Sequence, residues 1–344
     1  MSKIKFAVIG AGHIGKRHAE MVMRNAESEL VAICDTRTKK DCAVSYDVPF
    51  FQDADEMLRS IACDVVCVCT PNGLHAAHGL LALKYEKHLV IEKPMALHKS
   101  DCEQMLYQAL SVHKQVFCVM QNRYSPPSVW IKDVLDKKLL GNIYMVKVDC
   151  FWNRDHRYYK SDNWKGRLEL DGGTLFTQFS HFIDIMYWLF GDIKNIQARF
   201  GDFNHHDNTE FEDSGIVSFD FVNGGLGSFN FSTSVYDVNY ESSLTIVAEK
   251  GTVKLGGQYM NEVSYCNINN YQMPELPEGN PANDYGAYKG SAANHVYIIE
   301  NVVDTLKGRT NITTNAMEGL KVVDIIERIY QSAPRHLKIA EKVG

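Results

Sequence analysis

Short apolar runs alternate with stretches of helical periodicity along the first 120 residues. The apolar runs predict buried strands at residues 4–9, 30–34, 65–69, 89–91 and 115–120. The stretches between them predict helices at residues 16–23, 54–61, 74–85 and 100–112. Strands that alternate with helices at this spacing pair in parallel, so the pattern predicts a doubly wound α/β sheet. Ligands of such sheets bind beyond the carboxyl ends of the strands.

The pattern changes after residue 122, where a Tyr-Ser-Pro-Pro segment interrupts the alternation. Further strands are expected at residues 143–151, 196–200, 214–221, 226–233, 243–248, 252–255 and 263–268, with helices at 129–135, 174–189, 292–306 and 316–331. Residues 269–290 are polar and contain three prolines, which predicts a long loop. We therefore expect two domains, 1–122 and 123–344. The second is an α+β domain with an open, mainly antiparallel sheet and helices on one face.

The helix expected at residues 174–189 carries two stripes when its residues are placed at about 100° intervals. The apolar stripe consists of Leu175, Phe179, Phe182, Met186 and Leu189. The second stripe, centred about 140° away, consists of Thr174, Thr177, His181, Asp184 and Trp188. A core face opposite a histidine-centred polar face suits a wall of a substrate pocket, and an amphipathic helix with a surface histidine is the alternative.

Composition and charge exclude several classes of protein. The 344 residues are 45% hydrophobic and 23% charged, and the net charge of −6 is spread without acidic or basic blocks. These values are typical of a soluble globular protein, and they argue against a nucleic-acid or membrane-surface binder. The nine cysteines are scattered through apolar runs, as expected for buried thiols in a reducing, cytoplasmic location. No apolar run approaches the length of a membrane span, and the N-terminal run enters a glycine motif directly, unlike a signal peptide.

The motif Gly-Ala-Gly-His-Ile-Gly at residues 10–15 lies between the first expected strand and the first helix. In that context it is the Rossmann dinucleotide-binding motif, and a glycine-rich turn without a ligand is the alternative. Asp35, at the end of the second strand, can accept both ribose hydroxyls and would repel a 2′-phosphate. We therefore expect NAD rather than NADP, a preference that the neighbouring Arg37 moderates. The cofactor residues expected here are Gly10, Gly12, His13, Ile14, Gly15 and Asp35.

Two later strand ends carry further polar residues. We expect contacts with the cofactor from Thr70, Pro71, Asn72, His75, Glu92 and Lys93. His75 and His78 lie one helical turn apart, which is a spacing that can hold a metal ion. No third ligand lies nearby in the sequence, so we expect roles at the helix start and in packing, and no metal.

Five motifs together resemble the Gfo/Idh/MocA family, named for glucose–fructose oxidoreductase and inositol 2-dehydrogenase. They are GAGHIG at 10–15, TPN at 70–72, EKP at 92–94, GG at 172–173 and HFID at 181–184. The resemblance covers essentially the whole chain. It implies hydride transfer between a sugar or cyclitol carbon and a nicotinamide, with a second domain that shapes the substrate pocket. It also implies a homo-oligomer, a dimer or a tetramer.

The resemblance implies that Lys93 and His181 are the catalytic pair. Our hypothesis is that His181 removes the hydroxyl proton and Lys93 orients or polarises the reacting oxygen, and the family leaves the reverse open. One position departs from the family pattern. Four residues before the histidine the family commonly carries Asp, and its nucleotide-sugar branch Asn, whereas this chain has Thr177. A hydroxyl orients the histidine more weakly than a carboxylate, and Asp184 either compensates or packs.

Residues 158–173 and 291–295 resemble the branch that oxidises C3 of UDP-N-acetylhexosamines and their uronates. Basic side chains suited to a diphosphate or a uronate are Arg157, Lys160, Lys165 and Arg167, and rings suited to stacking are Tyr158, Tyr159 and Trp164. An exposed basic and aromatic loop is the alternative. The substrate residues that we expect are Arg123, Tyr159, Trp164, Arg167, Thr177, Asn294 and His295.

Four functions remain open on the sequence alone. The first is C3 oxidation of a nucleotide sugar that feeds amino-sugar synthesis for surface glycans. The second is oxidation of a free sugar or inositol by the same fold. The third is an NAD-dependent glycoside hydrolase that oxidises C3 transiently, and the fourth is a cofactor-binding regulator without turnover, against which the Lys93 and His181 pair argues.

Overall fold

A computed structural model describes residues 2–159, 164–286 and 288–333. The chain forms two compact units: Met1–Met120 with His295–Val323, and Gln121–Asn294 with Asp324–Gly344. Each unit is therefore built from two segments. The sequence predicts a single crossing, after residue 122, whereas the chain crosses again near residue 294 and within the last helix.

The first unit is built on a parallel sheet with strand order β3-β2-β1-β4-β5-β6. The strands are β1 (Ile4–Ile9), β2 (Ser28–Cys34), β3 (Phe50–Phe51), β4 (Val65–Val68), β5 (His88–Ile91) and β6 (Val116–Cys118). This order confirms the predicted doubly wound sheet. The two-residue strand β3 was not predicted, because it is too short to form an apolar run.

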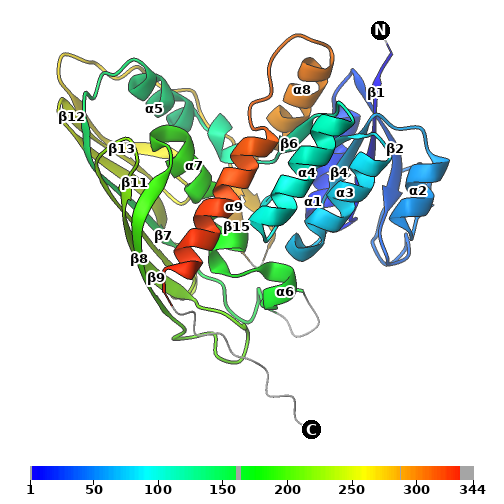
Figure 1. Cartoon of the computed structure of the whole chain (residues 1–344), viewed down its shortest axis with the longest axis horizontal. Coiled ribbons are helices and arrows are strands. Elements are labelled where there is room, and N and C mark those ends of the chain that lie inside the picture. The colour runs from blue at the N-terminus through cyan, green and yellow to red at the C-terminus, as the bar shows by residue number, and fades with distance from the viewer. Residues whose placement is uncertain (1, 160–163, 287, 334–344) are drawn as a thin grey trace. The chain divides into compact units, whose positions relative to one another are not determined.

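The helices of this unit are α1 (His13–Arg24), α2 (Ala54–Ser60), α3 (His75–Lys84) and α4 (Lys99–Ser111), with a 3₁₀ turn at Asn72–Leu74. Helices α2, α3 and α4 lie side by side along the sheet (Figure 1). Helix α8 (His295–Leu306) returns from the far end of the chain and packs on α1. The central strands β1, β4 and β5 are almost wholly buried, as their continuous apolar runs predicted.

The second unit is built on a seven-stranded sheet with strand order β13-β12-β11-β7-β10-β9-β8. Its strands are β7 (Ile143–Phe151), β8 (Ile193–Gly201), β9 (Ser214–Phe221), β10 (Leu226–Ser232), β11 (Glu241–Ala248), β12 (Gly251–Gly256) and β13 (Glu262–Ile268). All neighbours pair antiparallel except β10 and β7, which confirms the predicted open sheet. The predicted loop at 269–290 was wrong in part, because it contains β14 (Ala282–Asp284) and the start of β15 (Lys289–Ala292), which pair as a small hairpin.

Side chains alternate between buried and exposed along β9 and β10, so one face of this sheet meets solvent. Exposed apolar side chains on the strands include Met145, Ile216, Leu226, Val247 and Tyr265. The other face packs against α7 (Ser180–Phe190), which in turn contacts α5 (Pro126–Asp136). The last helix, α9 (Ala316–Gln331), contains the crossing between the units. None of the described helices combines the length and apolar character that crossing a bilayer requires.

The single α-helix predicted at residues 174–189 is two elements. Residues Leu175–Phe179 form a π-helical turn, and α7 follows from Ser180. The apolar stripe is buried as predicted except at its last residue, Leu189, which is half-buried. Thr174, His181 and Asp184 of the polar stripe are buried as well, and the prediction that this stripe faces a substrate pocket stays a prediction. A helix buried on both stripes holds its polar groups in a fixed hydrogen-bond network rather than offering them to solvent, and π-helical turns are frequent at functional sites.

Candidate active site

The glycine motif forms the turn between β1 and α1. Gly10 has a φ of 96°, and a Cβ there would lie 2.6 Å from the carbonyl oxygen of Cys69. A Cβ at Gly15 would lie 1.7 Å from the carbonyl oxygen of Gly10, so helix and turn touch. At Gly12, by contrast, a Cβ would meet nothing within 4 Å. The space over Gly12 lies outside the fold, at the start of α1, where the helix has no side-chain cap. This arrangement fits a pyrophosphate.

Asp35 lies beside this turn. Its carboxylate accepts the Ala11 N–H at 2.8 Å and is paired with the Arg37 guanidinium at 2.9 Å. Burial opposes ionisation, but the hydrogen bonds of Arg37 and Ala11 lower the pKa of Asp35 to about 2. The group is therefore a carboxylate at neutral pH, as acceptance of two ribose hydroxyls requires. These residues fit NAD. His13 is exposed and Ile14 is half-buried at the start of α1.

The strand-end residues of the first unit are tied to one another through His75. Its imidazole is buried, with Nδ1 2.7 Å from the carbonyl oxygen of Pro94 and Nε2 2.8 Å from that of Thr70. Pro71 and Asn72 lie in the turn between Thr70 and His75, and Asn72 is buried. His75 thus joins the end of β4 to the segment that carries Lys93, which is a packing role at the helix start.

Lys93 is half-buried and follows Glu92 at the end of β5. Its backbone N–H donates to Glu92 Oε2 at 3.2 Å. Glu92 is almost fully buried and faces His295 of α8, with Nε2 3.6 Å from Oε1. The structure therefore places His295 against the Lys93 segment in the first unit, and a contact of His295 with substrate stays a prediction.

In the second unit His181 is buried and contacts Gln121. The Gln121 side-chain amide nitrogen lies 3.1 Å from His181 Nε2, while Gln121 Oε1 is buried without a partner among the described residues. Rotating the amide by half a turn presents Oε1 instead, so one side chain suits both states of the ring. In one state it donates to the neutral Nε2, and in the other it accepts from the protonated Nε2–H.

Asn294 holds Gln121 in place. Its side-chain amide donates to the backbone oxygen of Gln121 and to the hydroxyl of Ser125, both at 3.2 Å. Its Oδ1 accepts from Asn280 at 2.9 Å, so the buried amide is fully used within this unit. Asn294 thus acts on His181 through Gln121, and a direct contact with substrate stays a prediction.

Arg123 and Asp184 form a buried ion pair between the turn after β6 and α7. Nε donates to Oδ2 at 2.8 Å and Nη2 to Oδ1 at 2.6 Å, and both side chains are fully buried. The guanidinium also lies over the Trp188 ring. This geometry gives both residues a structural role beside His181, and a contact of Arg123 with substrate stays a prediction.

Thr177 bonds to Asp171. The hydroxyl lies 3.0 Å from the backbone oxygen of Asp171 and hydrogen-bonds its carboxyl Oδ1, while Oδ2 accepts the Gly166 N–H at 2.8 Å. Burial raises the pKa of Asp171 to about 6, against the opposing effect of these bonds. When the carboxyl is protonated it donates to the Thr177 hydroxyl, which donates in turn to the backbone oxygen, so every donor has an acceptor.

The tyrosines that the sequence offered for stacking are buried. Tyr158 and Tyr159 contact each other edge to face in a cluster with Phe211. Lys165 lies over the Tyr158 ring, with Nζ 3.8 Å from its centroid. Arg154, which the sequence analysis missed, is buried and contacts the same ring. This geometry gives the tyrosines a packing role, and stacking on substrate stays a prediction.

The remaining predicted residues of this segment differ in exposure. Arg167 is exposed and Trp164 is half-buried. Arg157 is paired with Asp155, which leaves less of its charge for a substrate. Lys160 lies outside the described residues.

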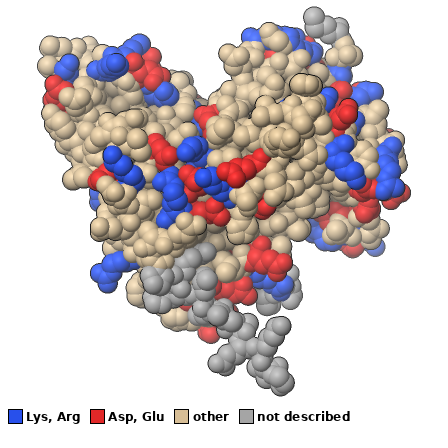
Figure 2. Space-filling view, viewed as in Figure 1, with Lys and Arg blue, Asp and Glu red and all other residues tan. Residues whose placement is uncertain are grey.

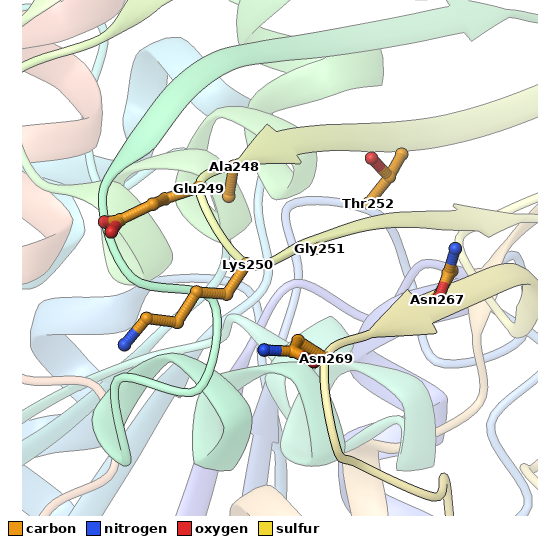
Figure 3. Close-up of a pocket in the computed structure, with 7 residues that line it drawn as sticks. All are labelled: Ala248, Glu249, Lys250, Gly251, Thr252, Asn267 and Asn269. Atoms are coloured by element: carbon orange, nitrogen blue, oxygen red, sulfur yellow. The ribbon is translucent and has the colours of Figure 1, made fainter.

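No predicted site residue lines the shallow polar pocket drawn in Figure 3, at the turn between β11 and β12. Acidic and basic side chains are interspersed on the face drawn in Figure 2. Lys93 belongs to the first unit and His181 to the second, and their pairing across a substrate stays a prediction.

Sequence reasoning missed Gln121, which contacts His181, Asp171, which bonds to Thr177, and Arg154, which contacts the Tyr158 ring. The rule that selected Asn72 and Lys93 at strand ends also covers Gln121, which follows β6 by three residues. Asp171 and Arg154 gave no comparable signal, because nothing in a sequence marks which charged residues are buried.

Comparisons with known proteins assign both parts of the chain to one family. The family described as an oxidoreductase family with an NAD-binding Rossmann fold matches residues 4–120, and the GFO/IDH/MocA C-terminal domain matches residues 129–254. The WlbA dehydrogenase from Bordetella pertussis, solved with NADH and UDP-GlcNAcA, is 29% identical, with a TM-score of 0.87 over 97% of this chain and 98% of that one. The Chromobacterium violaceum WlbA dehydrogenase, solved with the same ligands, is 31% identical, with a TM-score of 0.86 over 97% and 94%. The D-glucoside 3-dehydrogenase of Escherichia coli is 26% identical over 96% of each chain.

Proposed function

This chain belongs to the Gfo/Idh/MocA oxidoreductase family, and on that basis we propose that it oxidises C3 of a UDP-N-acetylhexosamine or of its uronate. It is an NAD-dependent sugar oxidoreductase. The proposal concerns the substrate, the carbon oxidised and the residues that act on it. We place the reaction in amino-sugar synthesis for surface glycans.

The observation that carries the proposal is the likeness to the two WlbA dehydrogenases. Both reach TM-scores of 0.86 or more at about 30% identity, and both were solved with a UDP-sugar. Other family structures, such as levoglucosan dehydrogenase, match this fold at 0.78 and 19% identity. A UDP-sugar is therefore better supported than a free sugar. The choice of C3 is supported by the D-glucoside 3-dehydrogenase.

Oxidation of a secondary alcohol needs a hydride acceptor and a base. When bound, NAD supplies the acceptor. His181 takes the C3 hydroxyl proton, and the Gln121 amide, whose nitrogen lies 3.1 Å from Nε2, orients the ring. The Lys93 ammonium donates a hydrogen bond to the reacting oxygen, which stabilises the negative charge that develops on it.

The substrate is tested with NAD and a panel of UDP-GlcNAc, UDP-GalNAc, their uronates, methyl glucoside and inositol. Absorbance at 340 nm reports NADH, and mass spectrometry of the product reports a loss of two hydrogens. Reduction of the product ketone with borodeuteride then leaves a deuterium on the carbon that was oxidised. We expect oxidation at C3 of a UDP-sugar. Turnover of methyl glucoside or inositol with no UDP-sugar oxidised contradicts the proposal.

The residue roles are tested in single turnovers with Lys93→Met and His181→Asn. Each substitution is expected to lower the rate of NAD reduction by about 10²- to 10⁴-fold. NADH binding, measured by its fluorescence, should remain in the His181→Asn protein, because His181 belongs to the second unit. Rates near wild type in both variants contradict the assignment.

A second candidate is oxidation of C3 of a free glycoside, favoured by the 26% identity to the D-glucoside 3-dehydrogenase over 96% of each chain. The panel above separates it from the first candidate. Glycoside hydrolysis through transient C3 oxidation predicts release of p-nitrophenol from aryl glycosides without net NADH, so p-nitrophenyl N-acetylhexosaminides are added to the panel and assayed at 405 nm.

A further inference from the structure

Three buried side chains from distant parts of the chain lie together at Glu92, the residue that precedes Lys93. His18 comes from α1, Glu92 from the end of β5 and His295 from the first turn of α8. All three belong to the first unit, and their exposed fractions are 0%, 7% and 2%. Charged and titratable groups are rarely buried this completely unless they are paired with one another or bind a metal ion.

Both imidazoles face one carboxylate oxygen. His18 Nε2 lies 2.8 Å and His295 Nε2 3.6 Å from Glu92 Oε1, with the two rings edge to face. Burial opposes ionisation of Glu92, but the hydrogen bond of His18 and the nearby His295 ring hold its pKa well below the ordinary range. Burial lowers the pKa of His295, which keeps that ring neutral. Glu92 is thus a buried carboxylate stabilised by N–H donors.

The other oxygen of Glu92 accepts the backbone N–H of Lys93 at 3.2 Å. Two residues further on, the Pro94 carbonyl oxygen accepts from His75. Residues 92–94, here called the lysine turn, are therefore held on one side through Glu92 and on the other through His75. Lys93 is the only one of the three that is not buried.

The same three groups have ligand atoms close enough to hold a metal ion. Histidines that bind metals nearly always donate their second ring N–H to an acceptor. Here Nδ1 of both His18 and His295 is buried without a partner among the described residues. An unprotonated Nδ1 follows if each ring carries its proton on Nε2 and donates it to Glu92. The hydrogen-bonded cluster therefore fits these contacts better than a metal site.

We propose that His18 and His295 are positioning residues for Lys93: they fix Glu92, which fixes the backbone of the lysine turn. The proposal rests on the catalytic role that we propose for Lys93. It also gives a role to the return of the chain to the first unit at residue 295, because α8 supplies the second imidazole facing Glu92. Helix α1 supplies the first donor and also begins at the glycine motif, so one helix serves both the cofactor and Lys93.

A matched pair of substitutions tests this idea at each histidine. Gln places its amide nitrogen near the position of Nε2, whereas Asn, shorter by one methylene, places it near Nδ1 and does not reach Glu92. Both are polar and neutral, so they differ mainly in reach. The control is His88→Asn, at the start of the same strand, where the imidazole accepts from the Gln115 N–H.

Hydrogen exchange of the peptide that covers residues 89–96 tests, without any substrate, whether His18 and His295 hold the lysine turn in place. We expect His295→Asn and His18→Asn to speed exchange there several-fold, and His295→Gln, His18→Gln and His88→Asn to leave it near wild type. Equal exchange in the Asn and Gln variants overturns the proposal. This measurement stands even if the proposed sugar is not the substrate, so the two failures are distinguishable.

Steady-state kinetics test the link to Lys93. We expect the Asn variants to lower kcat by on the order of 10- to 100-fold, with the KM for NAD little changed and with recovery in the Gln variants. An unchanged kcat together with faster exchange would show that the turn moves without affecting Lys93, which overturns the positioning role. One equivalent of zinc or another transition metal in the purified wild-type protein, lost in the Gln variants, would overturn the hydrogen-bonded cluster in favour of a metal site.

Discussion

Asp171 offers a prediction whose magnitude follows from its burial. Its carboxyl is 1% exposed, and burial raises its pKa from the ordinary 3.8 to about 6. A folded-state pKa above the unfolded value means that the folded state binds the proton more tightly. The contribution of this proton to the free energy of unfolding is therefore fully present below about pH 4, and it is lost as the pH rises through 6. A shift of about two pKa units corresponds to a loss of about 3 kcal/mol at pH 8.

The perturbation is Asp171→Asn, which keeps the shape and never ionises. Its Oδ1 can accept the Gly166 N–H, and its NH₂ can donate to the Thr177 hydroxyl, as the protonated carboxyl does. We expect the variant to be more stable than wild type by about 3 kcal/mol at pH 8, and equally stable near pH 4.

Tryptophan fluorescence during urea unfolding measures this difference. All four tryptophans, at 130, 152, 164 and 188, lie in Gln121–Asn294, so the signal reports the unit that contains Asp171. The opposite-sign control is Asp213→Asn. Burial opposes ionisation of Asp213, but His205 and backbone N–H groups hold its pKa well below the ordinary range, so this substitution should cost most at pH 8. A gain at Asp171→Asn that is independent of pH, or a loss at pH 8, would refute the reasoning.

Three further predictions concern other contacts. Gln121→Glu places a carboxylate about where the amide contacts His181, which favours the imidazolium, so the acidic limb of the kcat profile should move to higher pH by about one unit. Arg123→Met leaves Asp184 buried without its cation and should cost about 3–5 kcal/mol in urea unfolding, and replacing both residues by apolar ones should cost less. Asp35→Ser removes the carboxylate that would repel a 2′-phosphate, and the ratio of NADP to NAD dissociation constants, measured by fluorescence of the reduced forms, should fall at least tenfold.

Periodicity predicted most of the fold because burial decides it. The parallel strands are covered on both faces and read as continuous apolar runs, and the strands of the second unit alternate because one face meets solvent. The same reasoning failed at residues 282–292, where a small hairpin is set by backbone pairing with little apolar signal. It also failed at 175–179, because a π-helical turn changes the angle between residues that the two stripes assumed.

A second limit on prediction from the sequence is that it does not show which charged side chains pair with one another. An arginine is a residue type that often contacts substrates. A sequence does not show that Arg123 is paired with a buried carboxylate or that Arg154 lies among aromatic rings. His295 was selected for its resemblance to a substrate-contacting segment, whereas its ring faces Glu92 of the first unit. Long-range placement, rather than residue type, separates these roles.

Position 177 shows how the two limits combine. The resemblance led us to expect a carboxylate or an amide four residues before the histidine, where this chain has Thr177. In the fold, the αL conformation of Gly172 turns the chain after Asp171, and the Asp171 carboxyl reaches the Thr177 hydroxyl. The carboxyl is therefore present at this point of the helix, supplied from six residues earlier. With a pKa of about 6 this carboxyl exchanges its proton near neutral pH, whereas an aspartate at 177 would do so only if buried in the same way, and an asparagine there would not ionise at all.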